Sequence, residues 1–323
     1  MVNGDLKGTK SFSHAYVKFF IKKAVFYLIA LFIALTIAFI IPRLMVDTND
    51  FYMIYFFELY KPIEEQYLSF WLNLIQLDLG PSISYYPMRV SEVIIHPLFY
   101  SLVLAIPILF ISFFLGNWIG SKSAYLKGRA NEMTYFILLI LRSAPFYWLG
   151  LIIFVYFVVG NNILLSHPGA SSPQMIPGFR LDYFIDLLRH YLAPFITLLL
   201  VHAGSWAVGM RAMTLHEIDS SYISYAGHLG FRKKTLRKYA QRNAILPQFT
   251  LLNLRLNELI GETLIVEYVF LWPGIGNLYL KAIYARDYPL IMGVTIVILI
   301  IAILGNFLID ITYGFIDPRI KTS

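Results

Sequence analysis

Five ionisable side chains fall within or beside long apolar stretches of this sequence: Arg142, Arg255, Glu258, Glu262 and Asp310. A charge inside a bilayer is costly unless it is paired or hydrated, so each of these groups is a candidate functional residue. Arg255 precedes Glu258 by three residues and Glu262 by seven, a spacing that places all three on one helix face. Two interpretations stay open: an internal ion pair, or the polar lining of a water-filled route. A proton relay is a third.

A dense group of cations lies between two long apolar segments, in residues 221–247. It consists of Arg232, Lys233, Lys234, Arg237, Lys238 and Arg242. Such a run cannot lie in hydrocarbon, so we expect a cytoplasmic loop of a membrane protein. Apolar residues recur at helical spacing on both sides of Gly230, which predicts two short helices joined by a glycine bend. The loop either contacts a partner or only sets the topology.

The sequence contains no pattern typical of a catalytic or metal site. It has no GxxxxGK[ST] phosphate loop, no GxSxG elbow and no HExxH spacing. Cysteine is absent, which excludes disulfides, thiol catalysis and thiolate metal sites. We therefore expect no catalytic residue, no cofactor and no metal ion, and isolated polar roles for the seven histidines.

The composition is that of a helical membrane protein. Of the 323 residues 58% are hydrophobic and 14% are charged, against about 25% charged residues in soluble domains. The apolar runs are continuous and long, which favours helices over a β-barrel. We predict an all-α polytopic protein with six transmembrane helices, at residues 24–41, 98–119, 133–159, 191–210, 247–270 and 289–311. The first run lacks a small-residue cleavage site, so we interpret it as a retained span and not as a signal peptide.

The distribution of Lys and Arg predicts the orientation of these spans. Seventeen of them fall in the N-terminal segment, the loops after spans two and four, and the tail, and seven fall on the opposite side. Both termini and the central loop are therefore expected in the cytoplasm, with the chain in the inner or plasma membrane. This topology accounts for the net charge of +7 without a nucleic-acid partner.

The external end of the fifth predicted span has the sequence EYVFLWPGIGN, residues 267–277. Its Trp272 is expected in the interfacial aromatic belt. Residues 278–284 are apolar at helical spacing and precede the breaker RDYP at 286–289, which predicts a short helix over the outer face. This segment is a gate or docking surface, or a connector.

Several motifs in order resemble the permease subunits of binding-protein-dependent ABC importers of the dipeptide/oligopeptide type. The cytoplasmic signature is matched by Tyr225-Ala226, Gly230 and the RNAILP of 242–247. The external motif ExVFxWPGxG is matched at 267–276, RDYP at 286–289, and the tail motif Nx3Dx2Yx3DPR at 306–319. The similarity is strongest from about residue 98 to the end.

The resemblance implies a type I ABC importer permease architecture. Residues 1–97 would form an N-terminal cytoplasmic tail, the first span and an external loop, and residues 98–323 a five-helix core with a coupling loop at 211–246. Two permease chains pair, each docking its loop on an ATPase subunit, and ATP-driven closure switches the pair between inward-open and outward-open states. An external solute-binding protein delivers a polar solute, a peptide or alternatively an oligosaccharide.

The implied site residues form two groups. The ATPase-coupling residues are Tyr222, Tyr225, Ala226, Gly230, Phe231, Arg242, Asn243 and Pro247. The candidate pathway or gate residues are Arg142, Arg255, Glu258, Glu262, Trp272 and Asp310. The implied partners are a second homologous permease, two ATPase subunits, the solute-binding protein and membrane lipid. The alternative function is an ion-coupled secondary transporter that uses intramembrane carboxylates, and a membrane-embedded enzyme ranks third.

Overall fold

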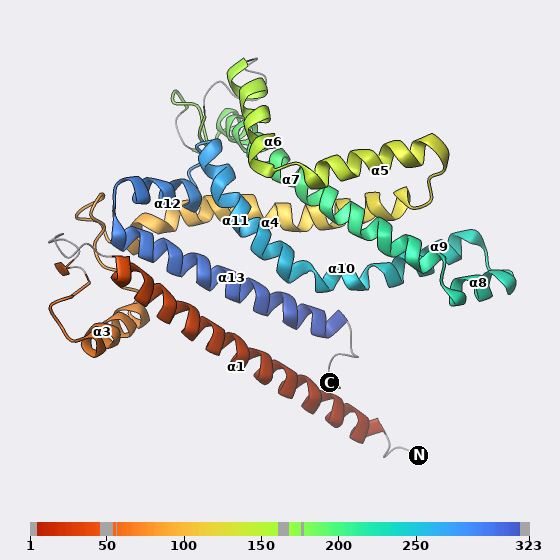
Figure 1. The fold of residues 1–323 in the computed structure, drawn as a ribbon, viewed down its shortest axis with the longest axis horizontal. Coiled ribbons are helices and arrows are strands. Elements are labelled where there is room, and N and C mark those ends of the chain that lie inside the picture. The colour runs from red at the N-terminus through yellow and green to blue at the C-terminus, as the bar shows by residue number, and fades with distance from the viewer. Residues whose placement is uncertain (1–4, 46–53, 56, 161–167, 176–177, 317–323) are drawn as a thin grey trace. The chain divides into compact units, whose positions relative to one another are not determined.

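The computed structural model describes residues 5–45, 54–55, 57–160, 168–175 and 178–316 (Figure 1). These residues form helices joined by turns, with one isolated β-bridge between Pro81 and Arg89 and no strand within the described ranges. The predicted all-α class is confirmed. The chain divides into two compact units, Met1–Ile95 with Lys281–Ser323, and His96–Leu280.

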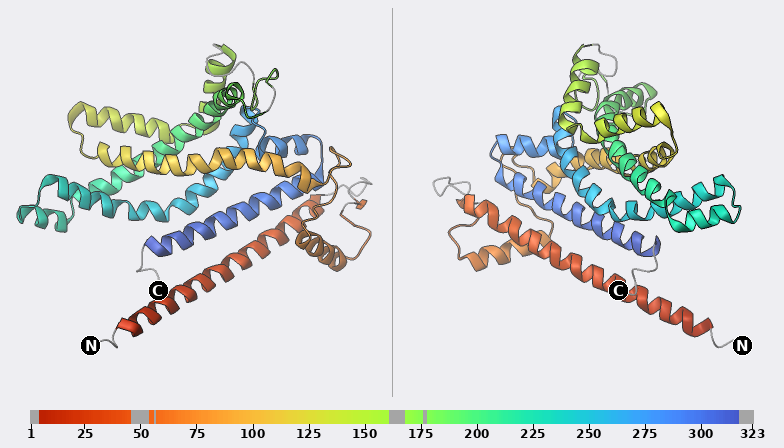
Figure 2. Two further views of the ribbon diagram at one scale, coloured as in Figure 1. Left: turned by 180° about the vertical axis from the view of Figure 1, so that it is seen from behind. Right: turned by 45° about the vertical axis from the view of Figure 1, so that its right-hand side comes forward.

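The first unit is built on two long apolar helices, α1 (Asp5–Met45) and α13 (Tyr288–Ile316). They lie side by side along their length (Figures 1 and 2). The short helix α3 (Ile63–Ile75) packs beside them, and Phe39, Phe70 and Ile296 are among the buried residues of the shared core.

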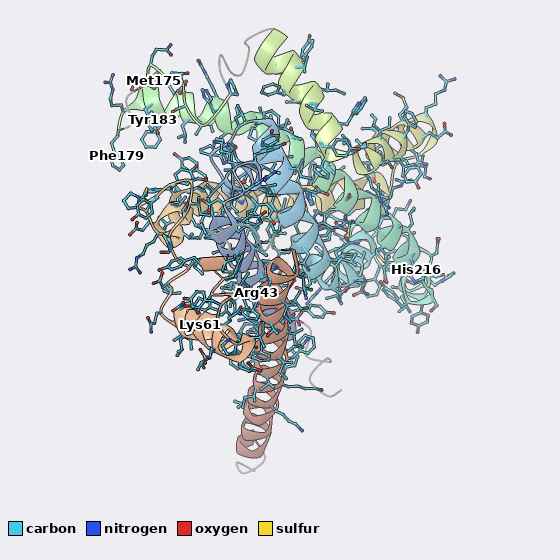
Figure 3. The ribbon with its side chains drawn as sticks, turned by 60° about the vertical axis from the view of Figure 1, so that its left-hand side comes forward. Arg43, Lys61, Met175, Phe179, Tyr183 and His216 are labelled. Carbon is cyan, nitrogen blue, oxygen red and sulfur yellow. The ribbon has the colours of Figure 1, made fainter. Side chains whose placement is uncertain are left out.

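Polar bonds fix the end of α1 against α3. The guanidinium of Arg43 lies 3.6 Å from the ring centroid of Phe39 and donates from Nε to Gln66 Oε1 at 3.0 Å. Gln66 Nε2 donates to the carbonyl of Lys61 at 2.9 Å, and Figure 3 shows Arg43 and Lys61 in this region. A buried amide therefore joins three segments of the first unit.

The RDYP motif forms the start of α13. Asp287 is fully buried and its Oδ1 accepts the backbone N–H of Leu290 at 3.1 Å, as an N-terminal cap. Its Oδ2 accepts the hydroxyl of Ser82 at 2.5 Å and the N–H of Ser84 at 2.8 Å. One carboxylate therefore caps the start of α13 and also holds the loop that precedes α4 (Val90–Ser123).

The second unit surrounds α7 (Leu181–Ile218), which packs against its neighbours along most of its length. The other elements of this unit are α4 (Val90–Ser123, from residue 96), α5 (Gly128–Ser143), α6 (Phe146–Ile153), a π-helix (Phe154–Gly160), α8 (Ser221–His228), α9 (Lys233–Ala244), α10 (Leu246–Thr250), α11 (Leu252–Val269) and α12 (Ile275–Tyr284, to residue 280). A Cβ at Gly204 of α7 would come within 2.6 Å of the Leu141 Cβ on α5, so glycine permits this close crossing. Leu198 and Leu259 are buried in the core between α7 and α11.

Within the described residues, four helices are long and apolar enough to cross a membrane, in α1, α4, α7 and α13. They correspond to predicted spans one, two, four and six. A fifth arises if the bent pair Gly128–Ser143 and Phe146–Phe157 is one span. The predicted fifth span corresponds to α11. This helix is not among the four, because it contains too many charged residues.

The predicted third span, residues 133–159, is broken in the structure into α5 and α6. The chain bends by 97° between α5 and α6, where Ala144 and Pro145 have extended backbone with ψ of 124° and 122°. The proline ring disfavours helical backbone at the preceding residue, and Pro145 has no N–H to donate to the helical hydrogen bonds. The break at Pro145 is therefore a full change of direction.

Candidate functional site

The loop after α7 has the predicted two-helix form. Helices α8 and α9 are joined at Gly230, whose φ is +83°. The N–H groups of Gly230 and Phe231 donate to the carbonyls of Gly227 and Ala226 at 3.0 and 3.2 Å, which ends α8. A Cβ at Gly230 would meet no atom of this chain within 4 Å. The left-handed backbone, and not a close approach within the chain, is what requires glycine here.

Large apolar side chains are exposed at α8 and at the glycine bend that follows it. Tyr225 is 66% exposed, and Leu229 and Phe231 are also exposed, whereas Ile223 of α8 and Ala240 of α9 are buried against the rest of the unit. An exposed group of large apolar residues on a polar segment is typical of a protein interaction site. The loop thus has one face that packs and one face that is available to a partner.

Tyr222 joins three elements at the base of the loop. Its hydroxyl donates to Glu217 Oε2 of α7 at 2.5 Å and accepts from Asn243 Nδ2 of α9 at 2.8 Å. Burial, followed by the hydrogen bond to Glu217, raises the pKa of the Tyr222 hydroxyl above its usual value, so it remains a neutral donor. Tyr222 and Asn243 were predicted as coupling residues, whereas no local pattern marked Glu217.

The remaining predicted coupling residues occupy different positions. Ala226 is half-buried on α8, and Arg242 is exposed on α9. Pro247 lies in the first turn of α10, where a missing N–H carries little cost. These residues share the loop with Tyr222 but do not bond to it directly.

Arg211 is a structural cation, although the sequence pattern placed it among the loop charges. Helix α7 continues to Ile218, so residue 211 is helical and buried. Its guanidinium donates to the carbonyl of Ser123 and to Asn131 Oδ1, the latter at 2.5 Å. The side chain therefore connects α7, the end of α4 and the start of α5 beneath the loop.

The polar residues of α11 form two separate pairs. Arg255 Nη1 lies 2.7 Å from Glu258 Oε2, an ion pair that the three-residue spacing permits. Glu262 Oε2 instead lies 3.0 Å from Nε2 of His202 on α7. The His202 side chain is 4% exposed and that of Glu262 is 21% exposed. His202 was missed because a single histidine in an apolar helix carries no signal of its partner.

Three other predicted pathway residues lie apart from these pairs. Arg142 is exposed in the last turn of α5. Asp310, in the first unit, accepts from Lys23 at 2.5 Å and from Tyr27 at 3.0 Å, which joins α13 to α1. Trp272 is 1% exposed and donates to the Tyr100 carbonyl at 3.2 Å. Its assignment to an interfacial belt is wrong, because the ring is buried against α4.

The turn between α11 and α12 has a second buried anchor that sequence reasoning did not identify. Glu267 is fully buried at the end of α11, and its Oε2 accepts the N–H of Gly276 at 2.7 Å. The N–H of Ile275 donates to Ser101 Oγ at 2.7 Å. These bonds begin α12, whose predicted existence is confirmed with a start three residues earlier. Within the described residues, no group of three or more His, Asp or Glu side chains could hold a metal ion.

Membrane-length helices in both units, polar pairs on α11 and an exposed two-helix loop are features of a membrane transport component. Comparison with protein families is consistent with that class. Residues 112–322 match the model of the binding-protein-dependent transport system inner membrane component, and the chain belongs to this family.

Individual relatives agree with the family. The oligopeptide transport system permease protein AppB of Bacillus subtilis is 30% identical over 273 residues, which cover 82% of this chain and 84% of AppB. The probable D,D-dipeptide transport system permease protein DdpB of Escherichia coli is 31% identical, with 80% and 81% covered. The metal-staphylopine import system permease protein CntB of Staphylococcus aureus is 26% identical, with 87% and 83% covered.

The resemblance noted in the sequence, to importer permeases of the dipeptide/oligopeptide type, is confirmed. The chain is a multi-pass membrane permease subunit, and its relatives are permease subunits and not enzymes.

Proposed function

We propose that this chain is one of two permease subunits that import a peptide by alternating access. Separate ATPase subunits supply the energy and an external solute-binding protein supplies the solute. The peptide assignment is supported by the similarity to AppB and DdpB, which are named as permeases of oligopeptide and D,D-dipeptide transport systems. The proposal includes six spans, with α5–α6 and α11 as the third and fifth, and both termini in the cytoplasm. Residues 98–323 would act as the permease core.

The observation that carries this proposal is the exposed apolar face of α8. Tyr225 lies on α8, Leu229 and Phe231 follow the end of this helix, and Ile223 on its other side is buried. A partner that takes these side chains into a groove gains apolar burial. Docking therefore needs no rearrangement within α8, which would be the coupling helix.

The base of the loop supports transmission of movement. Tyr222 bonds α8 to α7 and α9, and Arg211 bonds α7 to the ends of α4 and α5. A displacement of α8 by an ATPase would act on these hydrogen bonds and on the long helices that carry them. The loop thus has both a docking face and a connection to the membrane helices.

A substitution at the glycine bend tests the proposal. Gly230→Trp forces a side chain into left-handed backbone, at a cost of about 1–2 kcal/mol, and adds bulk beside the docking face. We expect normal membrane insertion, but at least tenfold less ATPase subunit recovered with the permease. Gly128→Trp is the matched control, because Gly128 also has a positive φ of +56° and open space around it.

Tyr225→Ala provides a second variant that introduces no backbone strain. It removes a large exposed ring from α8, and we expect it to weaken ATPase recovery without lowering the amount of permease in the membrane. Wild-type recovery and transport for both Gly230→Trp and Tyr225→Ala would refute the assignment of α8 as the coupling helix.

A further inference from the structure

The last three turns of α4 combine an apolar stripe with a cation. Ile111, Phe114, Leu115 and Trp118 are all exposed, and because Phe114 and Leu115 each lie three or four residues from both Ile111 and Trp118, the four side chains share one face. Lys122 follows at the next position of this face, at the end of the helix. An apolar stripe that ends in tryptophan and lysine is the pattern of a helix leaving the bilayer at the headgroup level.

Two cations in this region are held by aromatic rings. Lys122 Nζ lies 3.7 Å from the ring centroid of Trp118, and the guanidinium carbon of Arg237 lies 4.6 Å from that of Tyr125. The N–H of Tyr125 donates to the Lys122 carbonyl at 3.1 Å, so both pairs meet at one turn of chain. Stacking orients the cations and leaves their charge uncompensated.

Helix α9 is held against this turn and adds only positive charge. Gln241 Nε2 lies 3.4 Å from Ser121 Oγ of α4. The sequence of α9, KKTLRKYAQRNA, contains no acidic residue. In the part of the chain that the structure describes, neither Lys122 nor Arg237 has a carboxylate within ion-pair distance. The turn therefore presents two oriented, unneutralised cations beside an apolar surface.

We propose that this surface binds an anionic phospholipid. Lys122 and Arg237 would bind the headgroup phosphate, for which the guanidinium offers a planar pair of donors. One acyl chain would lie along the stripe that contains Phe114 and Trp118. A soluble protein partner would leave the apolar stripe uncovered, whereas a phospholipid matches the phosphate-level cations and the apolar face at once. This lipid site is separate from the coupling and transport proposed above.

Native mass spectrometry of the full-length chain in detergent tests the site. The chain is mixed with equal amounts of phosphatidylglycerol and phosphatidylcholine that carry identical acyl chains, and bound lipid is counted. Each cation near the surface contributes about fivefold to anionic lipid binding. We expect Lys122→Gln with Arg237→Gln to lower the preference for phosphatidylglycerol by at least tenfold.

The matched control is Lys233→Gln with Lys238→Gln, which removes the same charge from exposed positions of α9. We expect this control to change the preference less than threefold. Trp118→Leu keeps the stripe apolar and removes the ring under Lys122, and we expect a smaller loss of about threefold. The Trp118→Leu result keeps the site testable if the double variant fails to fold.

Four results would overturn the inference. The first is no preference for phosphatidylglycerol in the wild-type chain, and the second is an equal loss in the two double variants, which would indicate diffuse charge. The third is an unchanged lipid preference in the Lys122/Arg237 variant with loss of ATPase recovery, which would assign the cations to a protein partner. Competition by inorganic phosphate alone would indicate a free-anion site and also overturn it.

Discussion

The pair between His202 and Glu262 offers a direct test of how α11 is held against α7. The two side chains approach to 3.0 Å, with His202 almost fully buried and Glu262 21% exposed. Removing one partner of a fully buried pair costs about 3–5 kcal/mol. Water at the exposed part of Glu262 and the polar amide of glutamine reduce this cost, so we expect Glu262→Gln to cost about 2 kcal/mol.

Thermal unfolding of the purified chain in detergent, followed by tryptophan fluorescence, measures this effect. Trp206 lies one turn after His202 and is buried, so it reports on the same contact region. At about 2–4 °C per kcal/mol, Glu262→Gln should lower Tm by about 4–8 °C. Glu258→Gln is the control, because Glu258 is 38% exposed and its bond to Arg255 contributes no more than about 1 kcal/mol.

A double-mutant cycle with His202→Gln separates the pair from its surroundings. If the two side chains stabilise each other, the double variant is destabilised by about 1 kcal/mol less than the sum of the single variants. A wild-type Tm for Glu262→Gln, or strictly additive losses, would refute the reasoning. Loss of transport at unchanged Tm would assign Glu262 to the lining of a water-filled route.

Two further predictions concern the start of α13 and the two-helix loop. Asp287→Ala removes a buried acceptor from Ser82 and from the start of α13, which should cost about 3 kcal/mol of stability and increase proteolysis of the loop before α4. The control Asp78→Ala, at an exposed ion pair, should change stability by about 1 kcal/mol or less, and equal effects of the two variants would contradict the role of Asp287 as a cap. Burial and a carboxylate neighbour raise the pKa of Tyr222, so the stability from its neutral hydroxyl is present below about pH 10 and is lost as pH rises through the higher folded value. Protease protection of α8 should fall in that alkaline range in the wild type, and an identical fall in Tyr222→Phe would contradict this assignment.

The sequence predicted the features that depend on local pattern. Continuous apolar runs identified α1, α4, α7 and α13, because a membrane helix must bury or present apolar side chains all around. Helical spacing on either side of Gly230 predicted α8 and α9, because a left-handed residue ends one helix before the next begins.

Features that depend on distant contacts were not predictable from one sequence. Arg211 bonds to Asn131, 80 residues earlier, and His202 meets Glu262 only because α7 packs against α11. The 97° bend at Pro145 exceeds a proline kink, since the residue before the proline is also extended. Trp272 has the residue type of an interfacial anchor, but the fold of its turn places the ring in the core.

The most direct test of the proposed importer is gentle detergent purification of this chain from its native membrane. Co-purifying chains would be identified by mass spectrometry, and ATP hydrolysis by the product would be measured with and without vanadate. The proposal predicts a second permease, ATPase subunits and vanadate-sensitive hydrolysis. A homo-oligomer that neither recovers an ATPase nor hydrolyses ATP, and whose transport follows a proton gradient, would contradict it.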